Sequence, residues 1–480
     1  MKIKITALFL VCLMFAAVFA GCGNGGVKPG NTTNNDDGKL EASLSILPKK
    51  DYDGYDFVIT YRDLYNSVDD MAFSQDNDNV LDKALYDRAM KVMDYYHVNI
   101  VPNVIQGDWA GQGALESLVV GDNDYDIIMP HSHIAWGTYI TNGYALEWTE
   151  NMKYNHLDQA WWDQGAYECL SVGNKYYTML GDFSWKLTGS SVGVLFNKAV
   201  FDEINEKYPY EYVDNMTWTF DVFHEIARRS VKDMDGDGQI TLGNDRFGYT
   251  TNLYMGPVGF LWTTGNGIIG KDGDDVPYLD VYHESTVNLY DKFFKMMGEN
   301  GFYIHNNRDS FQTQAHQEFV NEQVVMIDTL IENISQLRNM YDWGIVPYPM
   351  FTESVGRYYS TADAGVHSPV IPYNTKDPDR TSMVLEALAI EGYNQVIPAF
   401  YDVTLQIKYT DDDKSRDMLD LIRGTRRFDL AYYSNSCGSD FALVGTRLFL
   451  EGSSFTNFYA KHEEMARESI DEFIEVLIGK

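Results

Sequence analysis

Three aspartates at every second position, followed by a glycine, stand in the segment VKDMDGDGQITLGNDRFG at 231–248. Carboxylates in this alternation are typical of a calcium-binding loop, because Ca²⁺ prefers oxygen ligands and the glycine allows the sharp turn between them. Position 12 of such a loop is normally a bidentate Glu, and here it is Asn244 with an aspartate one residue later. The ligands that we expect are Asp233, Asp235, Asp237, the backbone carbonyl of Gln239, and Asp245.

The residues around this loop decide what kind of calcium site it would be. The segment RFGYTTNLY, which begins at Arg246, is predicted to be a strand rather than the second helix of an EF-hand, and the sequence holds no second loop of this pattern. Calcium sensors need a pair of such helices to move. We therefore expect a structural calcium ion that stabilises the connection after the preceding helix, remote from any ligand site. The alternative is an acidic turn that binds no metal.

Other patterns resemble catalytic motifs, but their context argues against catalysis. GSSVG at 189–193 matches G-x-S-x-G, yet that motif needs a strand, a sharp turn and a helix, whereas Ser191 leads into the apolar strand VGVLF. His131 and His133 would give a zinc ion two ligands, with no identifiable third. Acidic pairs arise by chance among 70 Asp and Glu residues. We expect a protein that is not an enzyme; the alternative is a lipid-anchored surface hydrolase of glycosides or esters.

The N-terminal segment is typical of an exported lipoprotein. Two lysines precede an uncharged apolar run that ends in Phe-Ala-Gly-Cys. Because this ending resembles a bacterial lipobox, we expect residues 1–21 to be a signal peptide and Cys22 to be the lipidated, palmitate-bearing first residue of the mature chain. Residues 22–50 are rich in Gly, Asn, Thr and Asp and bury almost nothing, so they should form a flexible acylated linker.

The composition of the whole chain is that of a globular protein. It is 45% hydrophobic, and the part after about Asp51 is long enough for two domains. The net charge of −33 argues against nucleic acid as a partner. Cys169 and Cys437 are the cysteines that remain after the signal and the anchor. We expect buried free thiols, with a disulfide between them as the alternative.

Predicted strands alternate with predicted helices, which is typical of an α/β fold with mostly parallel sheets. Thr219 is a plausible N-cap, with Asp221 in the first turn of the helix that follows. Strands are expected at 55–61, 98–104, 124–130, 192–196, 324–331 and 343–351, and helices at 80–97, 113–121, 216–232, 380–393, 413–425 and 460–479.

Several segments resemble a known family in their order and spacing. They are DYDIIMP with NGYALEWTE, VGVLFNKAVFDE, WTFDVFHEIARR, FVNEQVVMI and YDWGIVPYPMF. The chain is similar to the extracellular solute-binding proteins of family 1, the maltose-binding-like proteins of ABC importers. The resemblance implies a type 2 periplasmic-binding-protein fold, with two α/β lobes, a hinge, and a ligand cleft between the lobes. By analogy, lobe 1 takes 51–180 plus 362–425, and lobe 2 takes 190–361 plus 426–480, with the calcium-type loop at 233–245.

The resemblance also implies a function. The protein would capture an extracellular carbohydrate, for which we expect an oligosaccharide, and deliver it to ABC permease subunits in the membrane. It would be a monomer on the extracellular face of the cell membrane, held by its lipid anchor, with no nucleic-acid partner.

Candidate ligand-binding residues are chosen by their place in the sequence alone. Sugars present flat C–H faces and many hydroxyl groups, so their sites combine aromatic rings with polar side chains. Turns that follow predicted strands, and the predicted crossover between lobes, are the favoured positions. The candidates are Arg62, His131, His133, Trp136, Asp182, Trp185, Trp262, Asn266 and His367. The alternative for each is a packed or hydrogen-bonded structural residue.

Overall fold

The computed structural model describes residues 39–63, 70, 79–306, 308–337, 342–405 and 413–479. The expected signal peptide and Cys22 lie outside these residues. Within the described part of the chain, no helix is both long enough and apolar enough to cross a membrane.

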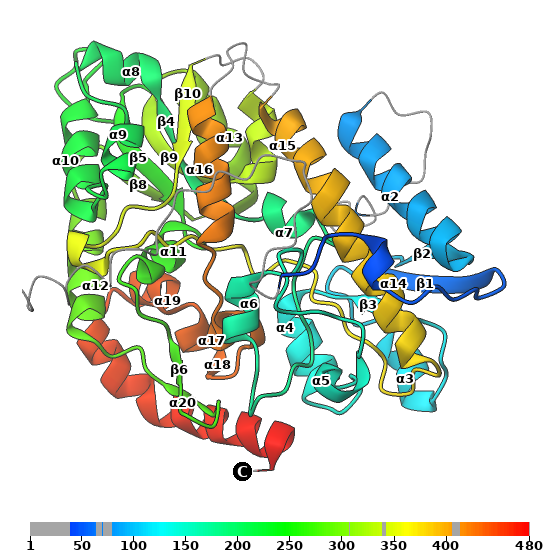
Figure 1. Ribbon diagram of the computed structural model, residues 1–480. Helices are drawn as coiled ribbons and strands as arrows, with labels where there is room; N and C mark the ends of the chain where they lie inside the picture. Colours follow the sequence, from blue (N-terminus) through cyan, green and yellow to red (C-terminus); the bar gives the residue numbers. More distant parts are fainter. Residues whose placement is uncertain are drawn as a thin grey trace, which may run out of the picture. The chain divides into compact units, whose positions relative to one another are not determined.

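Three parallel strands form the first sheet, in the order β2-β1-β3 (Figure 1). They are β1 (Tyr55–Arg62), β2 (Val98–Ile105) and β3 (Ile127–Met129), connected by α2 (Val80–Tyr96) and α3 (Leu115–Val120). The side chain of Asn79 accepts a hydrogen bond from the second residue of α2, and His97 ends that helix in the left-handed conformation, at a φ of 49°. Because both connections are crossovers between parallel strands, the carboxyl ends of all three strands lie at one edge.

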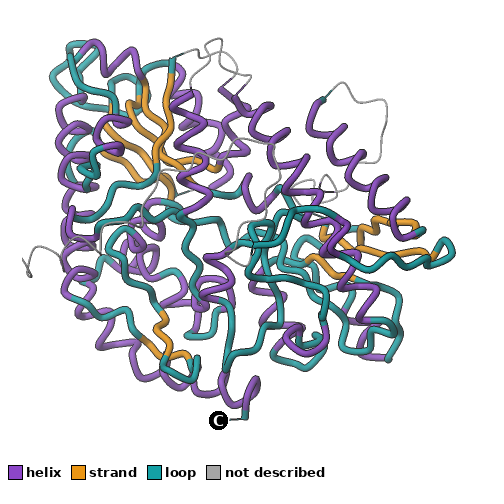
Figure 2. The backbone as a smooth tube through the Cα atoms, in the orientation of Figure 1, coloured by secondary structure: helices purple, strands orange, loops and turns teal. Residues whose placement is uncertain are grey.

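Five strands form the second sheet, in the order β10-β4-β9-β5-β8. Strand β5 is parallel to β8 and β9, whereas β4 is antiparallel to β9 and β10. The strands, orange in Figure 2, are β4 (Val192–Asn197), β5 (Phe247–Asn252), β8 (Phe302–His305), β9 (Val324–Leu330) and β10 (Trp343–Val346). A two-stranded antiparallel sheet pairs β6 (Ile269–Lys271) with β7 (Pro277–Leu279).

Helix α10 (Phe220–Ser230) begins where the sequence predicts. The Thr219 hydroxyl accepts a hydrogen bond from the Val222 N–H, and Asp221 lies in the first turn. The other helices are α4 (Ser132–Ile134), α5 (Trp148–Asn151), α6 (Gln164–Cys169), α7 (Lys186–Gly189), α8 (Lys198–Glu203), α9 (Pro209–Asp214), α11 (Gly256–Trp262), α12 (Glu284–Met297), α13 (Arg308–Val320), α14 (Pro378–Glu391), α15 (Ile397–Leu405), α16 (Asp413–Gly424), α17 (Leu430–Ser434), α18 (Gly438–Ala442), α19 (Val444–Glu451) and α20 (Phe455–Ile478).

The buried apolar side chains form two cores, one on each of the larger sheets. The first core also contains α14 and side chains between Phe428 and Leu477 from the C-terminal helices. The second core also contains side chains between Val396 and Ile422, from α15 and α16. In the segment 426–480, which the sequence groups with lobe 2, α17 packs on α4, α19 packs on α11, and α20 packs on α12 and β7. In the segment 362–425, α16 packs on β10 of the second sheet. The lobe boundaries themselves stay a prediction.

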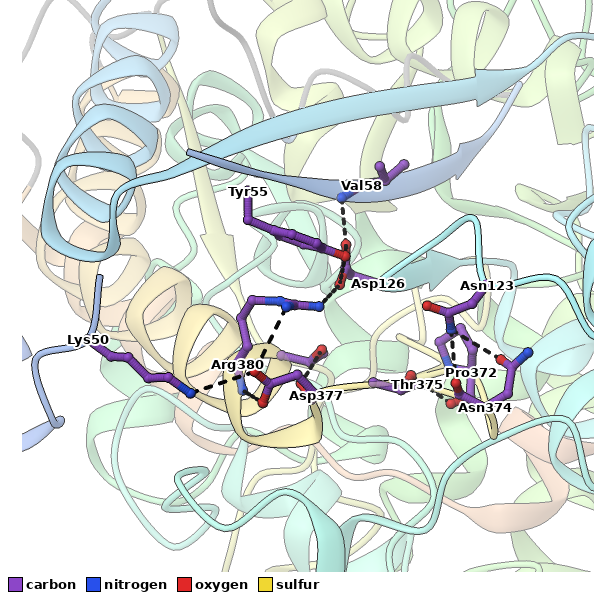
Figure 3. A network of polar contacts seen from close by, with 11 residues as sticks. Lys50, Tyr55, Val58, Asn123, Asp126, Pro372, Asn374, Thr375, Asp377 and Arg380 are labelled. Atoms are coloured by element: carbon purple, nitrogen blue, oxygen red, sulfur yellow. Dashed lines mark hydrogen bonds and ion pairs between the residues drawn. The ribbon is translucent and has the colours of Figure 1, made fainter. Parts of the chain in front are cut away.

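A network of polar contacts holds α14 against the amino-terminal edge of the first sheet (Figure 3). Asp126, just before β3, accepts hydrogen bonds from the Val58 N–H at 2.9 Å, the Tyr55 hydroxyl at 3.2 Å and the Arg380 guanidinium at 3.3 Å. The same guanidinium lies 3.5 Å from the centre of the Tyr55 ring. This network is at the edge opposite the carboxyl ends of the strands, so it serves the fold rather than a site at those ends.

A fully buried carboxylate stands in the second core. The hydroxyls of Tyr249, Thr251 and Tyr348 donate to Oδ2 of Asp328, on β9, at 3.0, 2.8 and 2.6 Å. Its Oδ1 atom has no hydrogen-bond partner among the described residues. Burial raises the pKa of Asp328 to about 6, and the three hydroxyl donors offset only part of that effect.

The Asp328 carboxyl predicts a pH dependence of stability. Between about pH 4 and pH 6 the unfolded chain releases this proton and the folded chain keeps it, so the contribution of Asp328 to the free energy of unfolding falls as pH rises through that window. Asp328→Asn stays neutral, so relative to the wild type it should gain about 2 kcal/mol between pH 4 and pH 7 in denaturant titrations. The matched control is Asp202→Asn, an exposed carboxylate bonded to Tyr208, which should follow the wild-type curve. Parallel curves for Asp328→Asn and the wild type would contradict the prediction.

Candidate functional site

The carboxyl ends of β1 and β3 meet a loop from much later in the chain, residues 360–367. Arg62, the last residue of β1, donates from its guanidinium to the Gly365 carbonyl. His131, two residues after β3, forms an antiparallel bridge with His367. Open α/β sheets bind ligands beyond the carboxyl ends of their strands. The structure therefore brings together three of the predicted site residues at the edge where a ligand is expected.

His367 is held by a buried carboxylate. Its Nδ1 atom lies 3.0 Å from Oδ2 of Asp70, and the Ser184 hydroxyl donates to the same oxygen at 2.5 Å. Burial lowers the pKa of His367 more than Asp70 raises it, so the imidazole is neutral at pH 7 and donates from Nδ1. For Asp70, burial acts to raise the pKa, but the hydrogen bonds from His367 and Ser184 bring it below the ordinary value. The neutral ring thus has Nε2 as an acceptor.

Tyr432, on α17, connects several of the predicted residues. Its carbonyl accepts from Nε2 of His133 at 2.6 Å, and its ring lies 6.3 Å from that of Trp262. Its hydroxyl accepts from the Ala364 N–H at 3.4 Å. Burial lowers the pKa of His133, so this imidazole is also neutral at pH 7. The sequence analysis missed Tyr432; the aromatic pair in DLAYYS, after an Asp that caps α17, is the signal that indicates it.

Asn266 lies beside a second residue that the sequence analysis missed. Its Nδ2 donates to the Ser285 hydroxyl at 2.7 Å, and the preceding Gly265 has a φ of +79°. Tyr359 is half-buried next to this glycine, with the guanidinium carbons of Arg357 and Arg427 at 5.3 and 5.4 Å from its ring centre. No local pattern separates Tyr359 from the other tyrosines of the chain, because its partners come from distant segments.

Three segments that run between the two cores lie side by side. The Val192 N–H donates to the Thr361 carbonyl at 2.9 Å, and the Arg427 N–H donates to the Ser360 carbonyl at 2.9 Å. Arg426 is buried here, with its guanidinium 2.5 Å from Asp163 and 3.3 Å from the hydroxyl of Ser191. These contacts join the segments at 188–192, 358–362 and 422–428, which is the arrangement that a hinge requires.

Ser191 is part of this junction and leads into β4, as the sequence predicts. Its hydroxyl donates to the Leu187 carbonyl at 3.1 Å. Asp182, another predicted site residue, is buried and pairs with Arg423 of α16. Burial raises the pKa of Asp182, although the two nearby arginines act against it.

The three predicted tryptophans are packed side chains in this structure. Trp136 is fully buried with its ring 5.7 Å from that of Phe473, and Trp262 is 1% exposed. Trp185 lies 5.0 Å from the Phe400 ring. Their contact with a ligand stays a prediction.

The calcium-type loop has its carboxylates gathered. Asp233, Asp235 and Asp237 each offer a ligand atom within 4.8 Å of the others. Both oxygens of Asp245 accept backbone hydrogen bonds, from Met234 at 2.8 Å and Thr241 at 2.7 Å, and these hydrogen bonds lower the pKa of Asp245. Asp245 thus connects the two ends of the loop through these hydrogen bonds, whether or not it also binds a metal.

Cys169 and Cys437 are free thiols, as expected; Cys437 is buried, whereas Cys169 is half-buried. Burial raises the pKa of Cys169 to about 11, so it is protonated at neutral pH.

No protein-family model matches the chain, and no curated protein matches it. Solved structures do. UspC from Mycobacterium tuberculosis superposes with a TM-score of 0.56 at 12% identity, over 86% of this chain and 100% of that one. UgpB from the same organism, in complex with glycerophosphocholine, gives 0.56 at 14% identity, over 88% and 99%. Lmo0181, an ABC substrate-binding protein from Listeria monocytogenes in complex with cycloalternan, gives 0.51 at 13% identity, over 89% and 100%. The chain has the fold of the ABC solute-binding proteins. The expected type 2 periplasmic-binding-protein fold is therefore confirmed.

The buried pair at the junction gives a prediction about stability. Arg426→Met leaves the Asp163 carboxylate buried without its cation, which should lower the free energy of unfolding by about 3–5 kcal/mol in denaturant titrations. Adding Asp163→Leu removes the stranded charge and should recover most of that loss. The control is Arg416→Met, whose exposed pair with Asp402 should contribute less than about 1 kcal/mol. Equal losses for Arg426→Met and the control would show that the junction does not depend on this pair.

Proposed function

We propose that this protein is the substrate-binding component of an ABC importer and that its ligand is a carbohydrate. The observation that carries the proposal is the fold, together with the polar site at the carboxyl ends of β1 and β3. Neighbours with this fold include Lmo0181 in complex with cycloalternan and a MalE domain from Bdellovibrio bacteriovorus bound to maltotriose, the latter with a TM-score of 0.51 at 15% identity.

The chemistry of the site suits hydroxyl groups. A neutral imidazole such as that of His367 has one donor and one acceptor nitrogen, and a sugar hydroxyl can serve as either partner. In this proposal Arg62 and Asn266 add donors from other segments. Each is fixed by a contact of its own, Arg62 by Gly365 and Asn266 by Ser285, so little conformational entropy is lost on binding.

The alternative function, hydrolysis, has less support. Ser191 was the candidate nucleophile, and its hydroxyl donates to the Leu187 carbonyl rather than to a base. Its side-chain neighbour at this junction is the guanidinium of Arg426, which cannot accept a proton. A binding protein without turnover is therefore the better proposal.

The location follows from the N-terminal segment. In this proposal Cys22 carries the lipid, the linker to residue 50 gives the folded part some reach, and the protein works as a monomer beside permease subunits on the extracellular face of the membrane. The support for this is the lipobox-like sequence.

The ligand class can be tested with a panel of sugars. Purified chain from residue 23 should melt at a higher temperature with the right mono- or oligosaccharide, because a ligand at one hundred times its Kd stabilises by about 2.7 kcal/mol. Calorimetry should then give one site per chain and no release of reducing ends. If amino acids or peptides raise the Tm and no sugar does, the carbohydrate proposal is wrong, and released reducing ends would favour the hydrolase.

We also propose a calcium ion in the loop at 233–245. The three gathered carboxylates of Asp233, Asp235 and Asp237 fit a hard divalent cation, and the Gln239 carbonyl would complete that side. The ion would offset the repulsion between carboxylates and tie the end of α10 to the start of β5.

Removal of calcium should lower stability and spare ligand binding. With a Kd of ~0.1 mM and ~1 mM calcium, the ion would contribute about 1.4 kcal/mol, so a chelator should lower the Tm by a few degrees. Asp235→Ala should give the same Tm with and without calcium, whereas Asp274→Ala, in another acidic turn, should keep the calcium response. Sugar affinity should change less than about threefold. If the Tm of the wild type is the same with and without calcium, the proposal of a calcium site is wrong.

A further inference from the structure

Trp109 differs from every other tryptophan of the chain in its exposure. The sequence has nine tryptophans, and the structure describes all of them. Eight are between 0 and 7% exposed, whereas Trp109 is 65% exposed. An indole is large and mostly apolar, so a folded protein normally buries most of it. Core packing therefore does not explain why a tryptophan stands at position 109, and a role at the surface has to be considered.

The loop that carries Trp109 is built to be rigid. The carboxylate of Asp108 accepts hydrogen bonds from the N–H groups of Gly111, Gln112 and Gly113, at 2.9, 2.9 and 2.7 Å. Gly111 has a φ of +88°, and a Cβ atom there would lie 2.6 Å from the Cα of Pro130, so only glycine fits. The exposed ring is therefore presented by a fixed backbone rather than by a loose loop.

The same loop is attached to the candidate site. The Asp63 N–H, directly after Arg62, donates to the Asp108 carbonyl at 2.9 Å, and the Gly107 N–H donates to the Asp63 carboxylate at 2.9 Å. The His131 N–H donates to the Ala110 carbonyl at 3.1 Å. Trp109 thus lies between Asp108, which accepts from the residue after Arg62, and Ala110, which accepts from His131, at the carboxyl edge of the first sheet.

We propose that Trp109 is the aromatic platform of the ligand site, on which one pyranose ring of the carbohydrate stacks its C–H face. This rests on the proposed function and assigns a residue to it. Two exposed polar residues, Gln112 on the loop and Asp63 hydrogen-bonded to it, can bond the hydroxyls at the rim of a stacked sugar.

The test compares Trp109→Ala and Trp109→Phe with the wild type. The matched control is Tyr303→Ala, which removes a 40% exposed aromatic ring from β8 of the second sheet. Each is titrated by calorimetry with the sugar that raises the wild-type Tm most, from a panel of maltotriose, cellotriose, xylotriose and raffinose. Trp109→Ala should weaken binding at least tenfold, and Trp109→Phe and the control should stay within about threefold.

A second readout does not depend on the variants. Because Trp109 is the exposed tryptophan, acrylamide quenching of the wild-type fluorescence reports mainly on its ring, and saturating sugar should lower the quenching constant at least twofold. If the wild type binds a sugar but Trp109→Ala binds it equally well, or quenching is unchanged at saturation, this inference is overturned and the proposed function stands. If the wild type binds none of a broad sugar panel, the proposed function itself fails.

Discussion

The junction between the two cores is built around the buried guanidinium of Arg426. A guanidinium cannot lose its charge, so at 5% exposure it has to be paired and hydrogen-bonded. Asp163 supplies the charge from the first core, and the hydroxyls of Thr188 and Ser191 supply acceptors from another segment of the chain. Satisfying this one group therefore fixes three segments against each other. The Arg427 N–H donates to the Ser360 carbonyl at 2.9 Å, so the 360–367 loop starts at this junction.

The candidate site shows the same principle at smaller scale. Asp70 is fully buried, and it tolerates burial because His367 and Ser184 donate to it. These buried polar groups stabilise the core less than apolar side chains would. They hold the His367 imidazole in one tautomer, so the ring is already oriented without a ligand. The loop around Trp109 is arranged similarly, since the Asp108 carboxylate fixes three backbone amides so that one ring can remain in water.

The local elements follow from the sequence because their signals are local. The strand at 55–61 and the N-cap at Thr219 are found where they are predicted, since alternation, capping and turn residues act within a few positions. The grouping of segments is not local. The helices after Phe428 pack against α4, α11, α12 and β7. An amphipathic helix does not specify such partners by itself, because its apolar face suits many surfaces and only the fit of the whole chain selects one.

The sequence by itself determined the alternation of strands and helices, the acidic loop with its glycines, and the resemblance that led to the fold. Those properties depend only on the types of residues and their spacing along the chain. Only the tertiary structure decided which aromatic rings are free to meet a ligand. Trp136 and Trp109 both follow strands of the same sheet, yet Trp136 is covered by Phe473 from the end of the chain, whereas Trp109 is 65% exposed. The exposure of a side chain depends on contacts between residues far apart in sequence. These contacts cannot be read from the spacing of residues along the chain.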